Sequence, residues 1–217
     1  MLLAFDLDGT LIDSVRDLSR SASELVTSLG GRPLGEEEVA EMVGEGAALL
    51  VQRALVAAGL DPRTPDTLAE FLRIYDRRLL ETTNAYQGIP EALTIASRRA
   101  RLAVLTNKPR RPTLRLLDAL GLTGYFDEVI AGDSPHGRKP DPAGLQALAR
   151  GDAQVMLIGD SPIDAQTAAA AGSAFAWARY GFSAPRFATP PDTAYVLERP
   201  SDLSEVVDRF AAISTGT

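Results

Sequence analysis

Two aspartates, Asp6 and Asp8, directly follow the first apolar run of the chain, Leu2–Phe5. Taken alone, an Asp-x-Asp pair in a loop is more often a turn or a cap than a catalytic pair. A carboxylate can, however, accept a phosphoryl group, and a second carboxyl group can protonate a leaving oxygen and later deprotonate water. The pair is therefore a candidate nucleophile and acid–base couple, provided that the rest of the sequence supplies a phosphoryl site.

Polar side chains also follow later apolar runs. Thr106 and Asn107 come after one such run. Asp160 comes after another, and Asp164 lies one helical turn beyond it. Lys139 stands in the loop before a helix-like segment. Each of these residues alone has an ordinary explanation as a turn, a helix cap or a surface cation. Their order at successive strand ends favours a common site, because ligands of open parallel sheets bind beyond the carboxyl ends of the strands.

A cluster of carboxylates at one sheet edge needs a cation among them, since like charges repel. Oxygen-only ligands suit a hard ion, and Mg²⁺ is the natural choice. A divalent cation and a lysine together attract a phosphoryl group whose charge would otherwise repel a carboxylate nucleophile. The residues therefore predict phosphoryl chemistry that depends on Mg²⁺.

The elements that must position these residues are short apolar runs bounded by Gly, Pro, Asp or Asn, which is typical of buried parallel strands. Helix-like patterns lie between several of them and predict a doubly wound α/β sheet. The expected strands are Leu2–Phe5, Leu102–Leu105, Val129–Ala131, Val155–Ile158, Ala174–Ala178 and Tyr195–Leu197. The expected helices of this part are Pro112–Leu120, Pro142–Ala149, Pro162–Ala171 and a tail helix, Leu203–Ile213.

Residues 14–83 show a different pattern, with helical segments and no convincing strand. We therefore expect an all-α cap domain at 14–83, inserted into an α/β core made of 1–13 and 84–217. The expected cap helices are Val15–Leu29, Glu36–Val43, Ala47–Ala58 and Thr64–Thr82.

Together these stretches resemble the four motifs of the haloacid dehalogenase superfamily, in the right order and from end to end of the chain. The stretches are Phe5-Asp6-Leu7-Asp8-Gly9-Thr10, Leu105-Thr106-Asn107-Lys108-Pro109, Arg138-Lys139-Pro140-Asp141 and Gly159-Asp160-Ser161-Pro162-Ile163-Asp164. Proline and isoleucine after Ser161 depart from the family, in which polar residues are commoner there. We expect this departure to alter only the helix start.

The resemblance implies a Rossmann-like core and assigns a role to each motif residue. Asp6 would be the nucleophile and Asp8 the general acid/base. Thr106, Asn107 and Lys139 would bind the phosphoryl group. Asp6, the backbone carbonyl of Asp8, and Asp160 would hold Mg²⁺, with Asp164 assisting.

The cap sequence Met42-Val43-Gly44-Glu45-Gly46, followed by Leu49–Arg53, is similar to the phosphoglycolate phosphatase-like subgroup. The resemblance implies a small phosphorylated metabolite as substrate, with 2-phosphoglycolate the best single guess, and makes Glu45 and Arg53 candidate substrate contacts.

Three alternatives stay open at this point. A phosphosugar mutase of the β-phosphoglucomutase type would share the intermediate. A haloacid dehalogenase proper would need neither Mg²⁺ nor a phosphate-binding lysine. A catalytically silent binding protein should have lost a motif carboxylate, whereas all are present.

Composition excludes other classes. The 217 residues contain no cysteine, so thiol catalysis and disulfides are excluded, and the one histidine, His136, reads as a solvated loop residue. The net charge of −7 argues against nucleic-acid binding. The sequence shows neither a membrane span nor a signal peptide, so we expect a cytoplasmic location. The oligomeric state is left open.

Overall fold

Short aliphatic runs form one six-stranded parallel sheet in this computed structural model, which describes residues 1–187, 189, 192–193 and 195–212. The strands are β1 (Leu2–Phe5), β4 (Arg101–Leu105), β5 (Glu128–Ile130), β6 (Val155–Gly159), β7 (Ala174–Ala178) and β8 (Tyr195–Leu197). Their order across the sheet is β5-β4-β1-β6-β7-β8. The first strand in the sequence is therefore central, and its carboxyl end lies beside the ends of β4 and β6.

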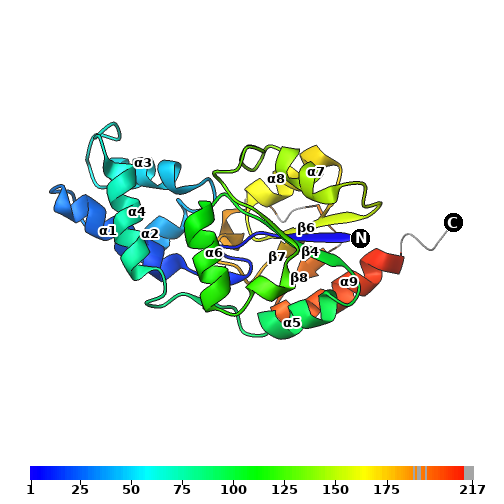
Figure 1. Ribbon diagram of the computed structural model, residues 1–217. Helices are drawn as coiled ribbons and strands as arrows, with labels where there is room; N and C mark the ends of the chain where they lie inside the picture. The colour runs from blue at the N-terminus through cyan, green and yellow to red at the C-terminus, as the bar shows by residue number, and fades with distance from the viewer. Residues whose placement is uncertain (188, 190–191, 194, 213–217) are drawn as a thin grey trace.

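Helices cover both faces of the sheet, because neighbouring side chains of a strand point to opposite faces. Leu3 and Phe5 of β1 face the cluster that contains α5 (Ile89–Ala96), α6 (Arg110–Ala119) and α9 (Leu203–Ala212). Leu2 and Ala4 face the cluster that contains α7 (Ala143–Ala149) and α8 (Pro162–Ala171). Figure 1 shows α7 and α8 on one side of the strands and α5 and α9 on the other. The predicted doubly wound α/β fold is confirmed.

Some element bounds differ from the prediction. The strand–helix pattern of the core was expected to resume near Arg101. Helix α5, which lies before that point, was therefore missed, although its apolar residues recur at helical spacing. It starts after Gly88, which adopts a left-handed conformation, and has proline in its first turn. Helix α6 begins at Arg110, two residues before the predicted start. Helix α9 ends at Ala212, and the predicted last residue of the tail helix, Ile213, lies outside the described residues.

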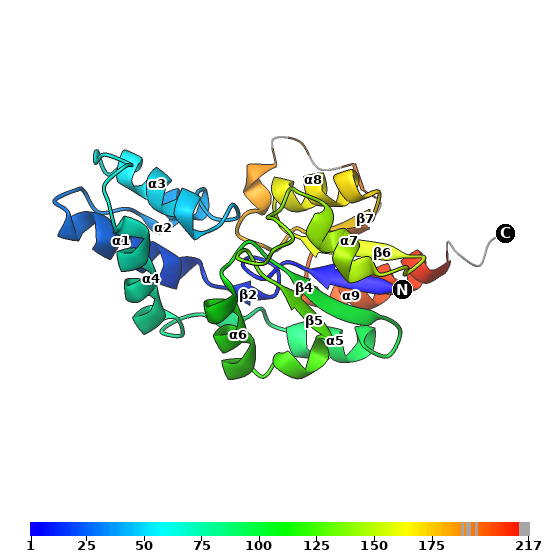
Figure 2. The same cartoon turned by 45° about the horizontal axis from the view of Figure 1, so that its top comes forward.

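Four helices form a separate lobe beyond the carboxyl ends of the strands (Figures 1 and 2), which we call the cap. They are α1 (Val15–Ser28), α2 (Glu36–Ala40), α3 (Ala47–Ala57) and α4 (Thr67–Arg78). All four are shorter than expected, α1 and α3 by one residue each. Helix α2 ends at Ala40 instead of Val43. Helix α4 starts only after Asp66, whose left-handed backbone ends the preceding loop, and it ends at Arg78 instead of Thr82. The division into core and cap domains at 14–83 stays a prediction.

The two chain crossings between core and cap lie side by side. Strand β2 (Ile12–Asp13) pairs antiparallel with β3 (Asn84–Ala85). Next to this pair, the buried carboxylate of Asp17 accepts hydrogen bonds from the backbone and hydroxyl groups of Thr82 and Thr83. This two-stranded ribbon was not predicted, because two-residue strands carry no periodic signal.

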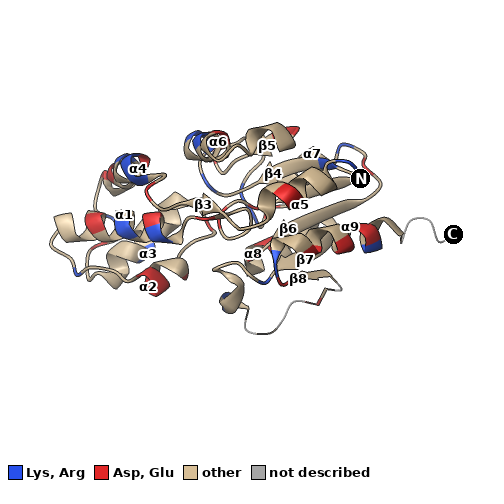
Figure 3. Ribbon diagram, turned by 90° about the horizontal axis from the view of Figure 1, so that it is seen from below, with Lys and Arg blue, Asp and Glu red and all other residues tan. Residues whose placement is uncertain are grey.

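The surface carries charges of both signs. Figure 3 shows basic and acidic residues on the same helices, for example α1 and α4. Arg77 and Arg78 of α4 pair with Glu24 of α1, and Arg73 pairs with Glu70. His136 is exposed, as expected. Within the described part of the chain, no helix has the length and apolar character needed to cross a membrane. The described residues also form three short 3₁₀ helices, η1 (Thr123–Tyr125), η2 (Ala184–Arg186) and η3 (Pro200–Asp202).

Candidate active site

The site lies where the connections of the sheet diverge. The chain leaves β1 toward β4 on the α5 face, whereas β6 is reached through α7 on the opposite face. Such a switch point leaves a crevice at the carboxyl ends of the two neighbouring strands. Asp6 follows β1, and Asp160 follows β6.

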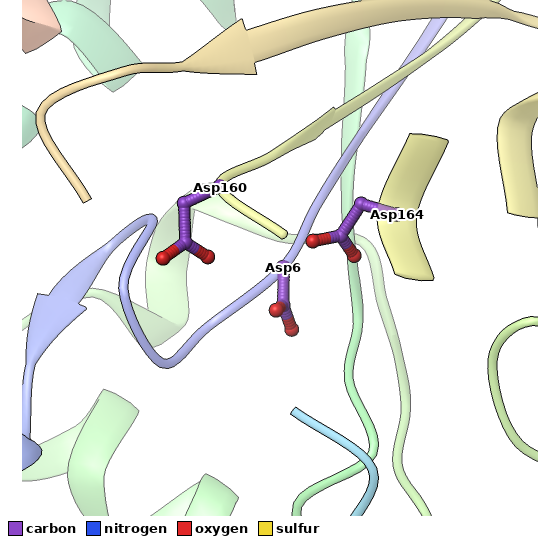
Figure 4. A group of neighbouring side chains, drawn as sticks. All are labelled: Asp6, Asp160 and Asp164. Carbon is purple, nitrogen blue, oxygen red and sulfur yellow. The ribbon is translucent and has the colours of Figure 1, made fainter. Parts of the chain in front are cut away.

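Three carboxylates meet in this crevice. Asp6, Asp160 and Asp164 each offer an oxygen within 4.8 Å of the others, and all three are buried. Figure 4 shows Asp6 on the segment that leaves β1, with Asp160 and Asp164 on either side of it. The Lys139 ammonium bridges two of them, at 2.8 Å from Asp6 Oδ1 and 2.6 Å from Asp164 Oδ1. One oxygen of Asp6 is thus fixed by the lysine while the other is left for chemistry.

Asp160 and Asp164 also accept hydrogen bonds from backbone amides. The Ser183 amide donates to Asp160 at 2.8 Å. Gly9 must lack a side chain, because a Cβ there would lie 2.1 Å from Asp160 Oδ2, and its φ of +86° favours glycine. Helix α8 starts at Pro162 with a capping box in which Ser161 and Asp164 bond each other reciprocally. The unusual Pro-Ile pair therefore leaves the helix start and the Asp160–Asp164 spacing intact.

The pKa values of these residues are set by burial and by the surplus of carboxyl groups over lysines. Burial raises the pKa of Asp6 to about 6, against the opposing effect of Lys139. Burial and then the neighbouring Asp164 and Asp6 hold the pKa of Asp160 well above its usual range. Burial lowers the pKa of Lys139, but the charges of Asp164 and Asp6 outweigh it and the net shift is upward. Lys139 is therefore a permanent cation in a site that sets three carboxyl groups against one lysine.

The donor set fits Mg²⁺. Its atoms are all oxygens that converge within 4.8 Å, and burial together with the neighbouring carboxylates raises the pKa values of Asp6 and Asp160. A hard divalent ion prefers oxygen ligands, and its charge would stabilise the ionised carboxylates. Backbone also closes tightly around this edge, since a Cβ at Gly181 would lie 2.2 Å from the Gly9 carbonyl oxygen.

Asp8 has partners of its own. The Ser14 hydroxyl donates to Asp8 Oδ1 at 2.5 Å, and the Lys108 ammonium lies 3.0 and 3.2 Å from its two oxygens. Lys108 also bonds the hydroxyl of Tyr75, at 2.7 Å, a residue of cap helix α4. The sequence reading gave no role to Ser14, Lys108 or Tyr75. One signal was available: the chain has only two lysines, Lys108 and Lys139, and both lie in this site.

Thr106 and Asn107 take different positions at the end of β4. The Thr106 hydroxyl accepts from the Lys108 amide at 3.2 Å and keeps its own hydrogen for a ligand. The Asn107 amide donates to the carbonyls of Gly44 and Lys139, both at 2.9 Å, and its oxygen accepts from the Lys139 amide at 2.8 Å. Both of its side-chain hydrogens are therefore engaged, and Asn107 joins three loops in this structure. Its contact with the phosphoryl group stays a prediction.

The cap reaches the site through the loop between α2 and α3. The Gly44 carbonyl is held by Asn107, and the Val43 carbonyl is held by Arg186 of the core. Glu45 and Arg53, the expected substrate contacts, form an ion pair with each other, and neither lines the cavity at the site. Their contact with substrate stays a prediction.

A cavity of about 40 Å³ lies between cap and core at this site. At roughly 10–15 Å³ per water molecule, it has room for about three waters. Its wall combines the catalytic edge with apolar cap residues. The lining residues are Asp6, Asp8, Leu18, Val43, Gly44, Gly46, Ala47, Leu50, Phe71, Leu72, Tyr75, Thr106, Asn107, Lys108, Pro109 and Pro112.

Comparison with known proteins places this arrangement among phosphatases. The model of the haloacid dehalogenase-like hydrolase family matches residues 3–178. The chain is 42% identical over 192 residues to a phosphoglycolate phosphatase of Rhodospirillum rubrum, which covers 82% of this chain and 79% of the relative. It is 35% identical over 223 residues to phosphoglycolate phosphatase 1 of Pseudomonas aeruginosa, with 98% and 81% covered.

Solved structures agree with this placement. A crystal structure described as a predicted phosphoglycolate phosphatase from Haemophilus somnus has a TM-score of 0.84 and 28% identity, and the match covers 94% of this chain and 96% of that one. A predicted phosphatase from Clostridium acetobutylicum, at 21% identity, shares the fold with a TM-score of 0.80.

Proposed function

The chain belongs to the haloacid dehalogenase-like hydrolase family and is a phosphoric monoester hydrolase, and from this premise we propose that it hydrolyses 2-phosphoglycolate with Mg²⁺ through a phosphoryl group carried on Asp6. The observation that carries the proposal is the bridging of Asp6 and Asp164 by Lys139 beside Asp160, at the ends of β1 and β6. The names of the relatives support the choice of substrate.

Lys139 and Thr106 receive the phosphoryl group in this mechanism. The ammonium already lies 2.8 Å from Asp6 Oδ1, so a phosphoryl oxygen bound to it is held next to the nucleophile. The Thr106 hydroxyl, which has a hydrogen to donate, lies at the end of the neighbouring strand. Asp6, Asp160 and the Asp8 carbonyl would hold Mg²⁺, with Asp164 orienting Lys139. When bound, the ion supplies a Lewis acid that offsets the phosphoryl charge.

Asp6 and Asp8 divide the covalent steps. The free oxygen of Asp6 attacks phosphorus, and the bond from phosphorus to the ester oxygen breaks. Asp8 gives its proton to that oxygen, which leaves as the alcohol of glycolate. Asp8 then takes a proton from water, which attacks the phosphoryl group and releases inorganic phosphate and free Asp6. Ser14 and Lys108 hold the Asp8 carboxylate in place for both transfers.

The cavity supports a small leaving group. With room for about three waters, it offers less space than a sugar ring needs, and no contact of the described residues favours a mutase. The cap excludes water from the first step while it is closed.

The test is phosphate release from a panel of 2-phosphoglycolate, sugar phosphates, nucleotides and pyrophosphate at neutral pH. We expect kcat/KM for 2-phosphoglycolate to exceed the others by about tenfold or more. A chelator should silence the enzyme, and Mg²⁺ should restore it. Equal rates across the panel would contradict the substrate, whereas activity that persists without metal would contradict the role of Mg²⁺. Conversion of a hexose 1-phosphate into its 6-phosphate would instead support the mutase.

A further inference from the structure

Lys108 is a buried cation in the wall of the active-site cavity. Only 4% of its side chain is exposed, yet it lies among the residues that line the cavity. Burial lowers its pKa, but Asp8 and Tyr75 outweigh this effect and raise it, so the ammonium keeps its charge at neutral pH. A permanent charge in such a place is costly unless it is paired and hydrogen-bonded.

Lys108 uses its three donors on two partners. An ammonium has three N–H groups. Lys108 donates to both oxygens of the Asp8 carboxylate and to the Tyr75 hydroxyl. The longest of these bonds, 3.2 Å to Asp8 Oδ2, is the one that can pass to a ligand carboxylate in the cavity that Lys108 lines.

Lys108 is the one basic residue among those found to line the cavity. Next to it lie apolar cap side chains, among them Leu50, Phe71 and Leu72. A cation with low-polarity walls favours a compact anion over a neutral group, because a hydrogen bond between charged groups is stronger than one to a neutral group.

Asp8 fixes how far such an anion is from the reacting bond. Lys108 Nζ lies 3.0 Å from Asp8 Oδ1. The general acid must approach the ester oxygen to about 2.6–3.2 Å. The ammonium and the ester oxygen are therefore within about 6 Å of each other, on either side of the same carboxylate. A carboxylate on the carbon that bears the ester oxygen spans this gap.

We propose that Lys108 is the specificity-determining residue of the site: it binds a carboxylate on the carbon that carries the phosphate ester and so selects 2-phosphonooxy carboxylates. The proposal rests on the phosphatase function above and names the residue that recognises its substrate class. Tyr75 brings the cap into this recognition, because its hydroxyl holds the same ammonium.

The experiment compares two substrates of equal length in the wild type and in Lys108→Met. One is 2-phosphoglycolate, and the other is 2-hydroxyethyl phosphate, which lacks the carboxylate. Lys108 also holds Asp8, so both rates should fall in the variant. The ratio of the two kcat/KM values cancels that shared loss. We expect the wild type to prefer 2-phosphoglycolate by about 100-fold and Lys108→Met to lose nearly all of that preference.

Two variants serve as controls. Arg111→Met removes a cation from an exposed position near the cleft, where Arg111 pairs with Asp76, and should leave the ratio within about threefold of the wild type. Lys108→Arg keeps the charge and should keep most of the preference. If Lys108→Met does not fold, the ratio in the wild type and in Lys108→Arg still tests the proposal.

Each outcome has one meaning. A wild type that cleaves both phosphates equally well overturns the proposal and leaves the phosphatase function standing. A ratio that stays at the wild-type value in Lys108→Met shows that Lys108 acts only through Asp8, which also overturns it. A wild type that cleaves neither phosphate contradicts the proposed function itself.

Discussion

Asp17 should contribute several kcal/mol to stability through its contacts with the second chain crossing. Its carboxylate is buried, with no exposed surface. Asp17 Oδ2 accepts from the amides of Thr82 and Thr83 at 3.0 and 2.9 Å and from the Thr83 hydroxyl at 2.8 Å, and Oδ1 accepts from the Thr82 hydroxyl at 2.5 Å. We therefore choose Asp17→Asn, which keeps the shape and removes the charge.

The magnitude follows from these bonds. An amide oxygen can replace Oδ2, and the amide nitrogen can donate to the Thr82 hydroxyl, so the contacts survive as neutral ones. A hydrogen bond to a charged group contributes about 1.5–3 kcal/mol and a neutral one about 0.5–1.5. With three bonds at Oδ2, the expected loss is about 3 kcal/mol. For a chain of this size that lowers Tm by about 6–12 °C.

The assay is thermal unfolding of the wild type, Asp17→Asn and Asp61→Asn. Asp61 is a matched exposed aspartate, bonded to its neighbour Arg63, and its variant should move Tm by about 1 °C or less. Burial raises the pKa of Asp17, and the hydrogen bonds from Thr82 and Thr83 outweigh it, so the net shift is downward from 3.8.

The direction of that pKa shift sets the pH dependence. A carboxylate with a lowered pKa stabilises the fold above its unfolded value and loses this effect as the pH falls through the folded value. The Tm gap between the wild type and Asp17→Asn should therefore be constant from about pH 7 to about pH 5 and narrow below 3.8. A gap under about 2 °C at neutral pH would refute the reasoning, as would a gap that does not change in acid.

Three further changes test the site itself. Asp6→Asn should lower kcat by about 1,000-fold or more, since an amide is a poor nucleophile, with circular dichroism unchanged; substantial phosphate release by the variant would rule out phosphoryl transfer to Asp6. Gly9→Ala should reduce Mg²⁺ affinity, measured by calorimetry, because its Cβ would displace Asp160; unaltered affinity would contradict the packing at that edge. Asn107→Ala should lower Tm by several degrees and kcat/KM by about tenfold, since the Gly44 carbonyl loses its donor; an unchanged Tm would contradict that linking role.

The sheet could be predicted from the sequence because its strands are buried on both faces. Runs such as Leu2–Phe5 and Val155–Gly159 are continuous and apolar, and glycine, aspartate or asparagine ends them sharply. Helix α5 was missed because it lies between the cap and β4, and no apolar run that predicts a strand stands before it to mark a strand–helix unit. The β2–β3 ribbon was missed because its two-residue strands depend on pairs that are more than 70 positions apart in the sequence, Asp13 with Asn84 and Ile12 with Ala85.

The candidate site divides in the same way. Asp6, Asp160, Asp164 and Lys139 were expected together, because each follows a strand or precedes a helix at one sheet edge, and the structure brings them together. The contact of Tyr75 with Lys108 could not be expected, since it depends on how the cap docks on the core. The phosphate contact expected of Asn107 was assigned by motif position alone and stays a prediction, whereas the contacts of its side chain with Gly44 and Lys139 depend on the fold.

The ribbon of β2 and β3 has a consequence for how such proteins change over evolutionary time. Because the chain leaves and re-enters the core through two paired strands, the ends of the intervening segment lie about 5 Å apart. A segment with adjoining ends can be shortened, lengthened or exchanged for another without moving the strands on which Asp6 and Asp160 stand. The ribbon is therefore a fixed point at which different cap domains can be attached to the same core. Chimaeras that join this core to the lobe of a relative at Asp13 and Asn84 should fold.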